Sequence, residues 1–303
     1  MIDNIKIRFN SKEPSENYLK STGKYIQPYF FGENKNEIYP IKKKLGNIEL
    51  RITEQNSVLS NSIHKFYNIK KYGDTLGSHN YNDFSYCNLL ESLEYLEKDF
   101  SGLNLNDGYL QSLEFGFNLQ VDKEPKYYID NNFLLYQHKA AAINKSTNAM
   151  HYKKFEHNNI AFKIYDKKTQ YRLLNNILRV EIVLGSSELK TLGIDSLNKL
   201  KDRQKILLLY TRMIQYFKGF TIVDNRFERR DLSEELINDL GNRLEPSYWK
   251  NKRGKSNIYR DKEKLKKIIF ENKLNQTETY FIELIRSKFY ELFYPCNFNL
   301  QVA

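Results

Sequence analysis

The sequence predicts an α+β protein in which helices lie on one face of a largely antiparallel sheet, followed by a mainly helical C-terminal region. Two observations support this prediction. Up to Leu184, segments that alternate apolar and polar residues, the two-residue period of a half-buried strand, are interspersed with segments of helical spacing. Beyond Leu184 the apolar residues keep helical spacing. We therefore expect an α+β domain over residues 1–200 and a helical region over residues 201–303.

The N-terminal part of the chain contains three segments with strand character. Residues 5–9 and 47–53 alternate apolar and polar side chains, and residues 62–67 are a candidate short strand. Residues 10–40 are polar and contain three prolines, so we expect a loop or edge region there.

A helix and the most regular strand follow a Gly- and Asn-rich loop. The loop, residues 77–83, ends beside Ser85, a candidate N-cap for a helix whose apolar residues begin at Leu89. Residues 113–121 then alternate without interruption, and a short helix is expected around residues 132–138.

The next strands form the centre of the predicted domain. Residues 150–155 and 160–167 predict a hairpin that turns at residues 157–159, and residues 178–184 predict a further strand. Beyond it, four apolar stripes at helical spacing begin at Ile206, Leu232, Leu265 and Phe281.

The uncovered face of this sheet is expected to carry polar groups from four strands. These groups are Glu49, Glu114, Tyr165 and Glu181. Lys163 and Lys167 flank Tyr165 on the same face of its strand, and Arg179 lies on the same face as Glu181. A tyrosine, cations and carboxylates on one face suit phosphodiester chemistry.

Composition favours a polyanionic partner inside the cell. The chain has 48 Lys and Arg against 37 Asp and Glu, a net charge of +11 and a pI near 9.2. Its two cysteines form no CxxC pair, which favours reduced thiols and excludes a cysteine-type zinc site. The sequence shows neither a membrane-spanning apolar run nor a signal-peptide pattern, so a cytoplasmic location is expected.

The positive charge is concentrated in residues 250–267. Nine basic residues and two acidic residues give this segment a net charge of +7. The basic residues are Lys250, Lys252, Arg253, Lys255, Arg260, Lys262, Lys264, Lys266 and Lys267. Trp249 and Tyr259 lie beside or within the segment, and aromatic rings among cations can stack on unpaired bases. The segment is therefore a candidate DNA-binding surface, with a solvated basic helix face as the alternative.

Tyr165 is the candidate nucleophile. A phenol has a pKa of about 10 and attacks poorly at neutral pH unless cations stabilise the phenolate and a metal polarises the phosphate. Lys163 and Lys167 meet the first requirement, and Glu114 and Glu181 offer oxygen ligands for Mg²⁺ or Mn²⁺. The alternatives are an ordinary strand tyrosine and, for Glu181, a structural ion pair with Arg179.

Other metal-ligand and nucleophile patterns are sparse. Five histidines include no His-x-His pair, and P-loop, dinucleotide-binding and common nucleophile motifs are absent. His79 lies in the Gly- and Asn-rich loop beside Asn80, where it could bind a metal or simply stabilise the loop. Glu49 is a further candidate ligand on the expected polar face.

Five motifs appear in the order found in phage and plasmid rolling-circle replication initiators. They are Ser62-Ile63-His64-Lys65, Gly77-Ser78-His79-Asn80-Tyr81-Asn82-Asp83-Phe84, Leu113-Glu114-Phe115-Gly116, Lys163-Ile164-Tyr165-Asp166-Lys167 and Leu178-Arg179-Val180-Glu181. In these motifs, over about residues 45–200, the chain resembles the group typified by the gene II product of filamentous phages.

The resemblance implies a nicking-endonuclease-like fold and a defined chemistry. A tyrosine would nick one strand at an origin, keep the 5′ end as a phosphotyrosine, free a 3′-OH and later rejoin the displaced strand. The resemblance places this nucleophile at Tyr165 with Lys167 as its helper, and metal-site candidates at Glu114, Glu181 and the pair His79-Asn80. Asn80 and Lys65 become candidate DNA contacts.

The expected function is therefore a metal-dependent, site-specific DNA nickase and ligase that initiates rolling-circle replication. Its cofactor would be Mg²⁺ or Mn²⁺, and its partners origin DNA, a host helicase and a host polymerase, with no membrane involved. Two alternatives remain open: a non-catalytic DNA-binding protein of a plasmid or phage, and a conjugative relaxase.

Overall fold

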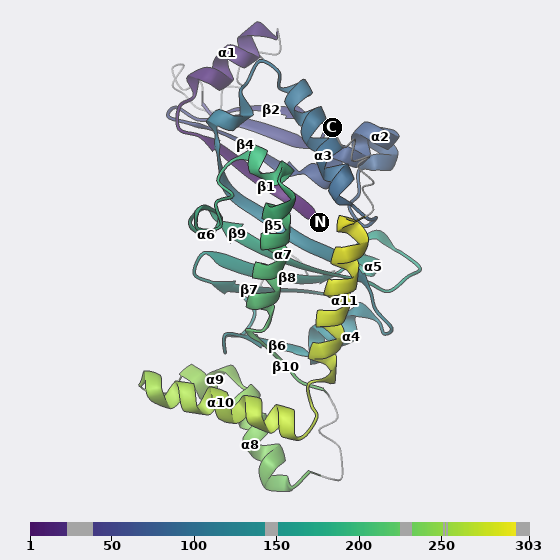
Figure 1. Ribbon diagram of the computed structural model, residues 1–303, viewed down its shortest axis with the longest axis vertical. Helices are drawn as coiled ribbons and strands as arrows, with labels where there is room; N and C mark the ends of the chain where they lie inside the picture. Colours follow the sequence, from purple (N-terminus) through teal and green to yellow (C-terminus); the bar gives the residue numbers. More distant parts are fainter. Residues whose placement is uncertain (23–38, 143–150, 225–231, 251, 253, 295–303) are drawn as a thin grey trace, which may run out of the picture. The chain divides into compact units, whose positions relative to one another are not determined.

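The computed structural model describes residues 1–22, 39–142, 151–224, 232–250, 252 and 254–294. Eight strands form one sheet (Figure 1), in the order β2 (Ile41–Leu45), β3 (Ile48–Ile52), β4 (Ser57–Ser62), β1 (Ile2–Phe9), β5 (Tyr109–Gln120), β9 (Ile177–Gly185), β8 (Ile160–Asp166) and β7 (Tyr152–His157). A second sheet pairs β6 (Phe133–Tyr136) with β10 (Phe220–Ile222). The predicted α+β class with a largely antiparallel sheet is confirmed.

The described helices lie before, between and after these strands. They are α1 (Glu13–Ser21), α2 (Ile63–Gly77), α3 (Tyr86–Asp99), α4 (Pro125–Asn131), α5 (Lys167–Tyr171), α6 (Ser186–Thr191), α7 (Arg203–Phe217), α8 (Glu234–Leu244), α9 (Pro246–Lys250), α10 (Lys255–Glu271) and α11 (Gln276–Phe293). The mainly helical C-terminal region is also confirmed, with the short strand β10 as an exception.

By its contacts the chain forms two compact units. Unit 1 comprises Met1–Gly116, Ile182–Thr211 and Phe289–Ala303, and unit 2 comprises Phe117–Glu181 and Arg212–Lys288. The division falls within β5 and β9, so each of these strands contributes residues to both units. The assignment of catalysis to residues 1–200 and of DNA binding to residues 201–303 remains a prediction.

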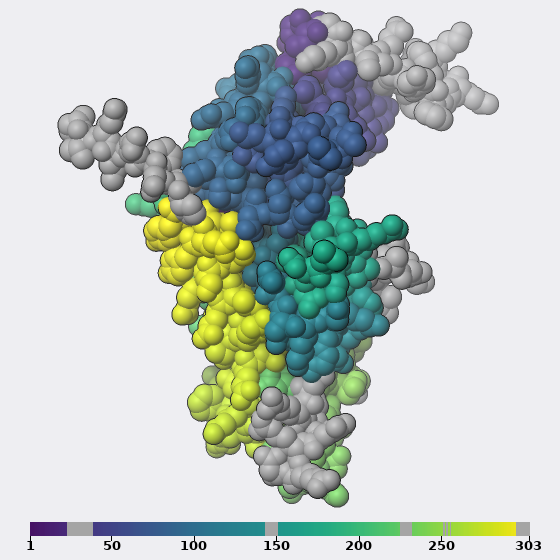
Figure 2. All heavy atoms as spheres, turned by 90° about the vertical axis from the view of Figure 1, so that its right-hand side faces the viewer, coloured from purple at the N-terminus to yellow at the C-terminus, as the bar shows by residue number. Residues whose placement is uncertain are grey.

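In unit 1 the helices α2 and α3 pack on each other beside β1. Their atoms are part of the blue surface in Figure 2. The predicted strand over residues 62–67 is wrong, because Ser62 caps a helix: its Oγ accepts a hydrogen bond from the backbone N–H of Lys65 at 3.0 Å. Ile63, Phe66 and Tyr67 are buried at helical spacing, a pattern that a six-residue window also allows for a strand.

Three other local predictions need correction. α1 lies within residues 10–40, expected to be irregular, and Pro14 occupies its first turn, where its missing N–H costs nothing. The helix expected around residues 132–138 is wrong: the helix there ends at Asn131, and β6 follows because it pairs with β10. Cys87 is disulfide-bonded, so the expectation of reduced thiols is also wrong.

Other elements agree with the alternation of the sequence. β5 spans residues 113–120 of the predicted strand, and β7 and β8 form the predicted hairpin, with Asn158 at φ 50° in its turn. Met150 lies outside the described residues. Ser85 caps α3 as predicted, and its Oγ accepts from the backbone N–H of Asn88.

Unit 2 has an aromatic core and a helical cluster. Phe162 of β8 lies 4.9 Å from Phe220 and 6.3 Å from Phe217, ring centroid to ring centroid. α8, α9 and α10 lie together (Figure 1) and enclose a cluster of buried apolar side chains. Its members are Leu135, Val223, Leu240, Trp249, Leu265, Ile268, Ile269 and Leu274. Burial of these apolar side chains stabilises the short helix α9.

An ion-pair network at the edge of this cluster predicts acid sensitivity. Asp261 accepts a hydrogen bond from Nη1 of Arg243 at 2.9 Å and pairs with Lys252. Hydrogen bonding to Lys252 is the main cause that lowers the pKa of Asp261 to about 2, from 3.8. Because the folded pKa is depressed, this stabilisation is present above pH 4 and is lost as the pH falls towards 2.

We expect Asp261→Asn to have a lower urea midpoint at pH 5 and to lose less stability than the wild type between pH 4 and pH 2. Urea unfolding followed by circular dichroism measures both midpoints. Glu263→Gln, which alters an exposed carboxyl on the same helix, is the control. An equally steep decline in Asp261→Asn would contradict the assignment.

In the part of the chain that the structure describes, no helix is both long enough and apolar enough to span a membrane.

Candidate functional site

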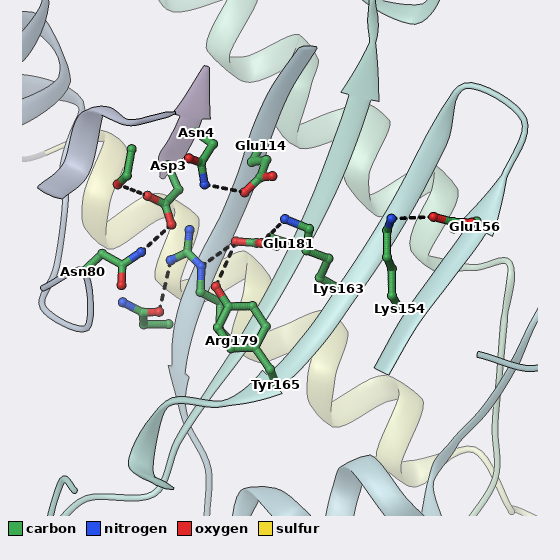
Figure 3. A network of polar contacts seen from close by, with 12 residues as sticks. Asp3, Asn4, Asn80, Glu114, Lys154, Glu156, Lys163, Tyr165, Arg179 and Glu181 are labelled. Atoms are coloured by element: carbon green, nitrogen blue, oxygen red, sulfur yellow. Dashed lines mark hydrogen bonds and ion pairs between the residues drawn. The ribbon is translucent and has the colours of Figure 1, made fainter. Parts of the chain in front are cut away.

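In unit 2, β8 and β9 place a tyrosine and two cations around one carboxylate, Glu181 (Figure 3). The hydroxyl of Tyr165 lies 3.4 Å from Oε2 of Glu181, and Nζ of Lys163 lies 3.3 Å from Oε1. Nε of Arg179 donates to Oε2 at 2.7 Å. Lys163 and Tyr165 share a face because they are two residues apart on a strand, as are Arg179 and Glu181. The predicted grouping of Tyr165, Lys163 and Glu181 is therefore present.

Glu181 and Arg179 form a buried ion pair. Their side chains are only 1% and 2% exposed, and Nη1 of Arg179 also donates to Asn118 Oδ1 on β5 at 3.0 Å. The sequence predicted these polar side chains on an open face of the sheet, but they are enclosed. Enclosure strengthens the interaction between Arg179 and Glu181, since little water screens it.

In unit 1, a β-bulge in β1 brings a further acid to the polar face. Ile2 pairs with Phe115 and Ile5 with Leu113, so that two residues, Asp3 and Asn4, face Glu114. A bulge of this kind redirects side chains that strict alternation would send to opposite faces. As a result Nδ2 of Asn4 donates to Oε2 of Glu114 at 2.7 Å, and Asp3 approaches the same carboxylate.

The buried carboxylate of Asp3 is held by two polar neighbours. It accepts hydrogen bonds from Ser62 Oγ at the end of β4 and from Asn80 Nδ2 in the loop after α2. Asn80, predicted as a DNA contact, thus orients an acid of the site. Hydrogen bonds of this kind fix the direction of a ligand's lone pairs.

Three carboxylates converge at the polar face. Glu114 on β5 and Glu181 on β9 lie on neighbouring strands, and one oxygen each of Asp3, Glu114 and Glu181 lie within 4.8 Å of one another. Three like charges at this spacing repel unless a cation lies between them. Their all-oxygen donor set, with Asn4 and Asn80 as supporting amides, fits Mg²⁺ or Mn²⁺ and offers no soft ligand.

Lys167 lies close to Tyr165, although β8 ends before it. Asp166 caps α5 by accepting from the backbone N–H of Thr169, and Lys167 is the first residue of that helix. Its buried Nζ lies 5.0 Å from the Tyr165 ring centroid and 4.9 Å from that of Tyr171, over both rings. This is a cation–π distance.

Two predicted metal ligands, Glu49 and His79, are not members of this group of carboxylates. Glu49 is on β3, three strand positions from β5, which corresponds to about 14 Å. The His79 ring stacks on Tyr81 at 4.2 Å, and its backbone oxygen accepts from Asn68 Nδ2. Among the described residues, Asp3, Glu114 and Glu181 form the one such cluster of potential ligands, and neither predicted residue belongs to it.

Most of the basic segment lies on α10, on its surface. Lys264 pairs with Asp239 at 3.1 Å, Lys266 with Glu263 at 3.1 Å and Lys267 with Glu271 at 3.6 Å. Other predicted DNA contacts have varied surroundings. Lys65 is half-buried on α2, Lys250 and Arg260 are exposed, Lys252 pairs with Asp261, Lys255 begins α10, and Arg253 lies outside the described residues.

Trp249, predicted to stack on a base, lies in the helical core of unit 2. Its Nε1 donates to the backbone oxygen of Arg243 at 2.7 Å, and its ring packs on His138 at 4.0 Å. Since only 7% of the residue is exposed, its ring is not available to a ligand in this conformation.

Asp3 is the site residue that the sequence analysis did not select. Counting by twos from Ile5 and Ile7 places Asp3 on the core face, where an acid would be unfavourable. That conflict is the one signal in the sequence for the bulge, because a buried charge in an apolar register indicates that the register changes.

Comparison with known proteins yields distant structural likenesses. No protein-family model matches the chain, and no curated protein matches it in sequence. A solved structure of a rolling circle replication initiator protein from Geobacillus stearothermophilus superposes with a TM-score of 0.35 and 12% identity, over 80% of this chain and 96% of that chain. A likeness at this level does not establish an activity for this chain.

Proposed function

We propose that this chain cuts and rejoins one strand of DNA through Tyr165, as an initiator of rolling-circle replication. One observation supports the proposal most directly. The Tyr165 hydroxyl lies 3.4 Å from Glu181, and the same carboxylate belongs to the group formed with Asp3 and Glu114. Nucleophile and metal ligands would therefore act on the same phosphate.

The reaction is a transesterification. The Tyr165 oxygen forms a bond to phosphorus, the bond from phosphorus to the 3′ oxygen breaks, and the 3′ oxygen leaves as a hydroxyl. The phenol loses one proton and the leaving oxygen gains one, so the numbers of phosphodiester bonds and protons are conserved. The reverse step, attack of a 3′-OH on the phosphotyrosine, rejoins the strand without an energy source.

The chain's own residues provide for charge and protons. Glu181 is placed to accept the phenol proton, because it is within hydrogen-bond reach of the hydroxyl. The ammonium of Lys167 over the ring face and Lys163 on the other oxygen of Glu181 would stabilise negative charge as it develops on the phenolate. A divalent ion held by Asp3, Glu114 and Glu181 would polarise the scissile phosphate.

The roles of the host polymerase and helicase follow from the products of the nicking reaction. A nick of this polarity leaves a 3′-OH, which is what a host polymerase extends, while a host helicase would separate the strands. The basic surface of the protein and its net charge of +11 suit origin DNA as the substrate.

A covalent-adduct assay tests the proposal. Supercoiled origin plasmid is incubated with Mn²⁺ or Mg²⁺, and the protein–DNA adduct is digested and identified by mass spectrometry. We expect the adduct on Tyr165 in the wild type, and a fall in nicking of at least about 1,000-fold in Tyr165→Phe, which should still bind DNA.

Tyr152→Phe is the matched control. Tyr152 lies directly opposite Tyr165 in the β7–β8 ladder, with ring centroids 5.9 Å apart, so it shares the surroundings of Tyr165. Its variant should form the adduct normally. DNA binding without any adduct in the wild type would instead support the non-catalytic DNA-binding protein.

A further inference from the structure

One face of α10 combines aromatic rings and lysines in a regular stripe. Tyr259, Lys262, Lys266 and Phe270 follow at intervals of three, four and four residues, so they lie along one side of the helix. We call these four residues the aromatic–lysine stripe. Over 11 residues it extends about 16 Å. A different side of the helix buries Leu265 in the core of unit 2.

The stripe borders a cavity that lies entirely within unit 2. The cavity has a volume of about 600 Å³, and Phe220 and Thr221 of β10 line it together with Lys218 and Glu278. Tyr259 and Phe270 also line the cavity, although they are 65% and 73% exposed. Aromatic side chains with exposures this high are unusual on a helix whose other side packs against a core.

Basic side chains outnumber acidic ones in the lining of the cavity. Lys218, Lys262 and Lys266 line it against Glu263 and Glu278, so three cations face two acids. Burial raises the pKa of Glu278, although Lys218 and Lys266 oppose this shift. Burial and repulsion from Lys266 lower the pKa of Lys262. An anion in the cavity would relieve this repulsion.

We infer that the aromatic–lysine stripe and its cavity bind single-stranded DNA, with phosphates at Lys262 and Lys266 and unpaired bases on Tyr259 and Phe270. Two lysines between two exposed rings provide both contacts that a single strand offers, whereas the bases of a duplex are already stacked. A protein partner fits less well, since protein interfaces are depleted in lysine.

The neighbouring side of α10 supplies a contrast within the same helix. Arg260, Lys264 and Lys267 lie there. Asp239 lies 3.1 Å from Lys264 and Glu271 lies 3.6 Å from Lys267, and on the stripe Glu263 lies 3.1 Å from Lys266, so ion pairs occur on both sides of the helix. Within the described residues 254–271, the two exposed aromatic side chains of α10 lie on the stripe and not on this side. If net charge alone bound DNA, both sides would contribute.

This binding would be separate from strand cleavage, since none of the stripe residues belongs to the site around Glu181. The inference therefore extends beyond the proposed function and can be tested when cleavage is blocked. Full-length protein in EDTA is titrated against a fluorescein-labelled oligothymidylate of about 12 nucleotides, and against the corresponding duplex, by fluorescence anisotropy.

Two double variants with the same charge change form the matched pair. For Lys262→Gln/Lys266→Gln we expect the slope of log Kd against log salt for the single strand to fall by about 1.4, since each lost phosphate contact accounts for about 0.7. Lys264→Gln/Lys267→Gln should keep the wild-type slope. Tyr259→Leu/Phe270→Leu should weaken single-strand binding at least about 5-fold per ring and leave the salt slope unchanged.

Thermal unfolding of each variant establishes that it is folded. If the two lysine variants lost single-strand affinity and salt slope equally, the binding would depend on net charge and not on the stripe. That result would overturn the inference. Unchanged single-strand binding in both stripe variants, or equal losses of single-strand and duplex binding in the ring variant, would do so as well. A positive result stands even if Tyr165 proves not to form an adduct.

Discussion

Replacing Asp3 with asparagine is expected to remove divalent-ion binding and strand cleavage together. Asparagine has nearly the same shape but no negative charge, so the group of three carboxylates loses one anionic ligand. Changes to the supporting partners of a metal ligand already cost about 10- to 100-fold in affinity or activity. We expect loss of a ligand itself to cost at least about 100-fold in cleavage. Asn80 also donates to this carboxylate, so a loss of stability of about 1–3 kcal/mol is expected too.

Metal binding gives a readout that does not depend on cleavage. At a Mn²⁺ concentration of about 100 times Kd, binding should stabilise the wild type by about 2.7 kcal/mol against unfolding. Urea unfolding with Mn²⁺ and with EDTA measures this difference, which should disappear in Asp3→Asn.

Glu49→Gln is the control for this experiment, because Glu49 was also predicted as a ligand but lies on β3, outside the group of three carboxylates. Its variant should keep both the metal response and cleavage. Loss of the metal response in Glu49→Gln, or its retention in Asp3→Asn, would show that the ion binds elsewhere.

The contrast between Asp3 and Glu49 marks the limit of strand periodicity as a guide to the site. Alternation identifies which side chains share a face of one strand, and it correctly groups Lys163 with Tyr165. It does not give the order of strands in the sheet, which separates Glu49 from Glu114 by two intervening strands. Nor does it reveal a bulge, and the bulge is what directs Asp3 to the polar face.

Local composition likewise predicted only part of the structure of the basic segment. Charge density indicated a surface helix, and α10 is such a helix. It could not show that Trp249 fills the core of unit 2, because burial depends on helices that pack from elsewhere in the chain. The short apolar run Phe133–Tyr136 fits helix or strand equally well, and pairing with β10 decides between them.

Arg179 is expected to be the residue of the site on which folding depends most. Its guanidinium is buried and is bonded to Glu181 and to Asn118. Removing one partner of a buried ion pair leaves a charge uncompensated in a medium of low polarity, which costs about 3–5 kcal/mol. We therefore expect Arg179→Met to lower the free energy of unfolding by about that amount in EDTA, measured by urea denaturation.

Lys163→Met provides the matched comparison, since Lys163 contacts the same carboxylate but its side chain is 21% exposed. We expect a loss of no more than about 1 kcal/mol, because water screens its charge. Equal losses in the two variants would mean that burial does not set the strength of the Arg179 pair.

Arg179→Met also tests whether Glu181 contributes both to folding and to metal binding. Arg179 neutralises part of the charge that three carboxylates bring together, so its removal should leave the group more negative. A divalent ion should then bind Arg179→Met more tightly and restore more stability to it than it adds to the wild type.

If Mn²⁺ raises the urea midpoint of Arg179→Met by no more than that of the wild type, the guanidinium and the ion do not act on the same carboxylate. If it raises the midpoint further, Glu181 is bonded by Arg179 when no ion is present and shared with the ion when one binds. In that case the buried arginine would stabilise the acidic site before metal and DNA arrive.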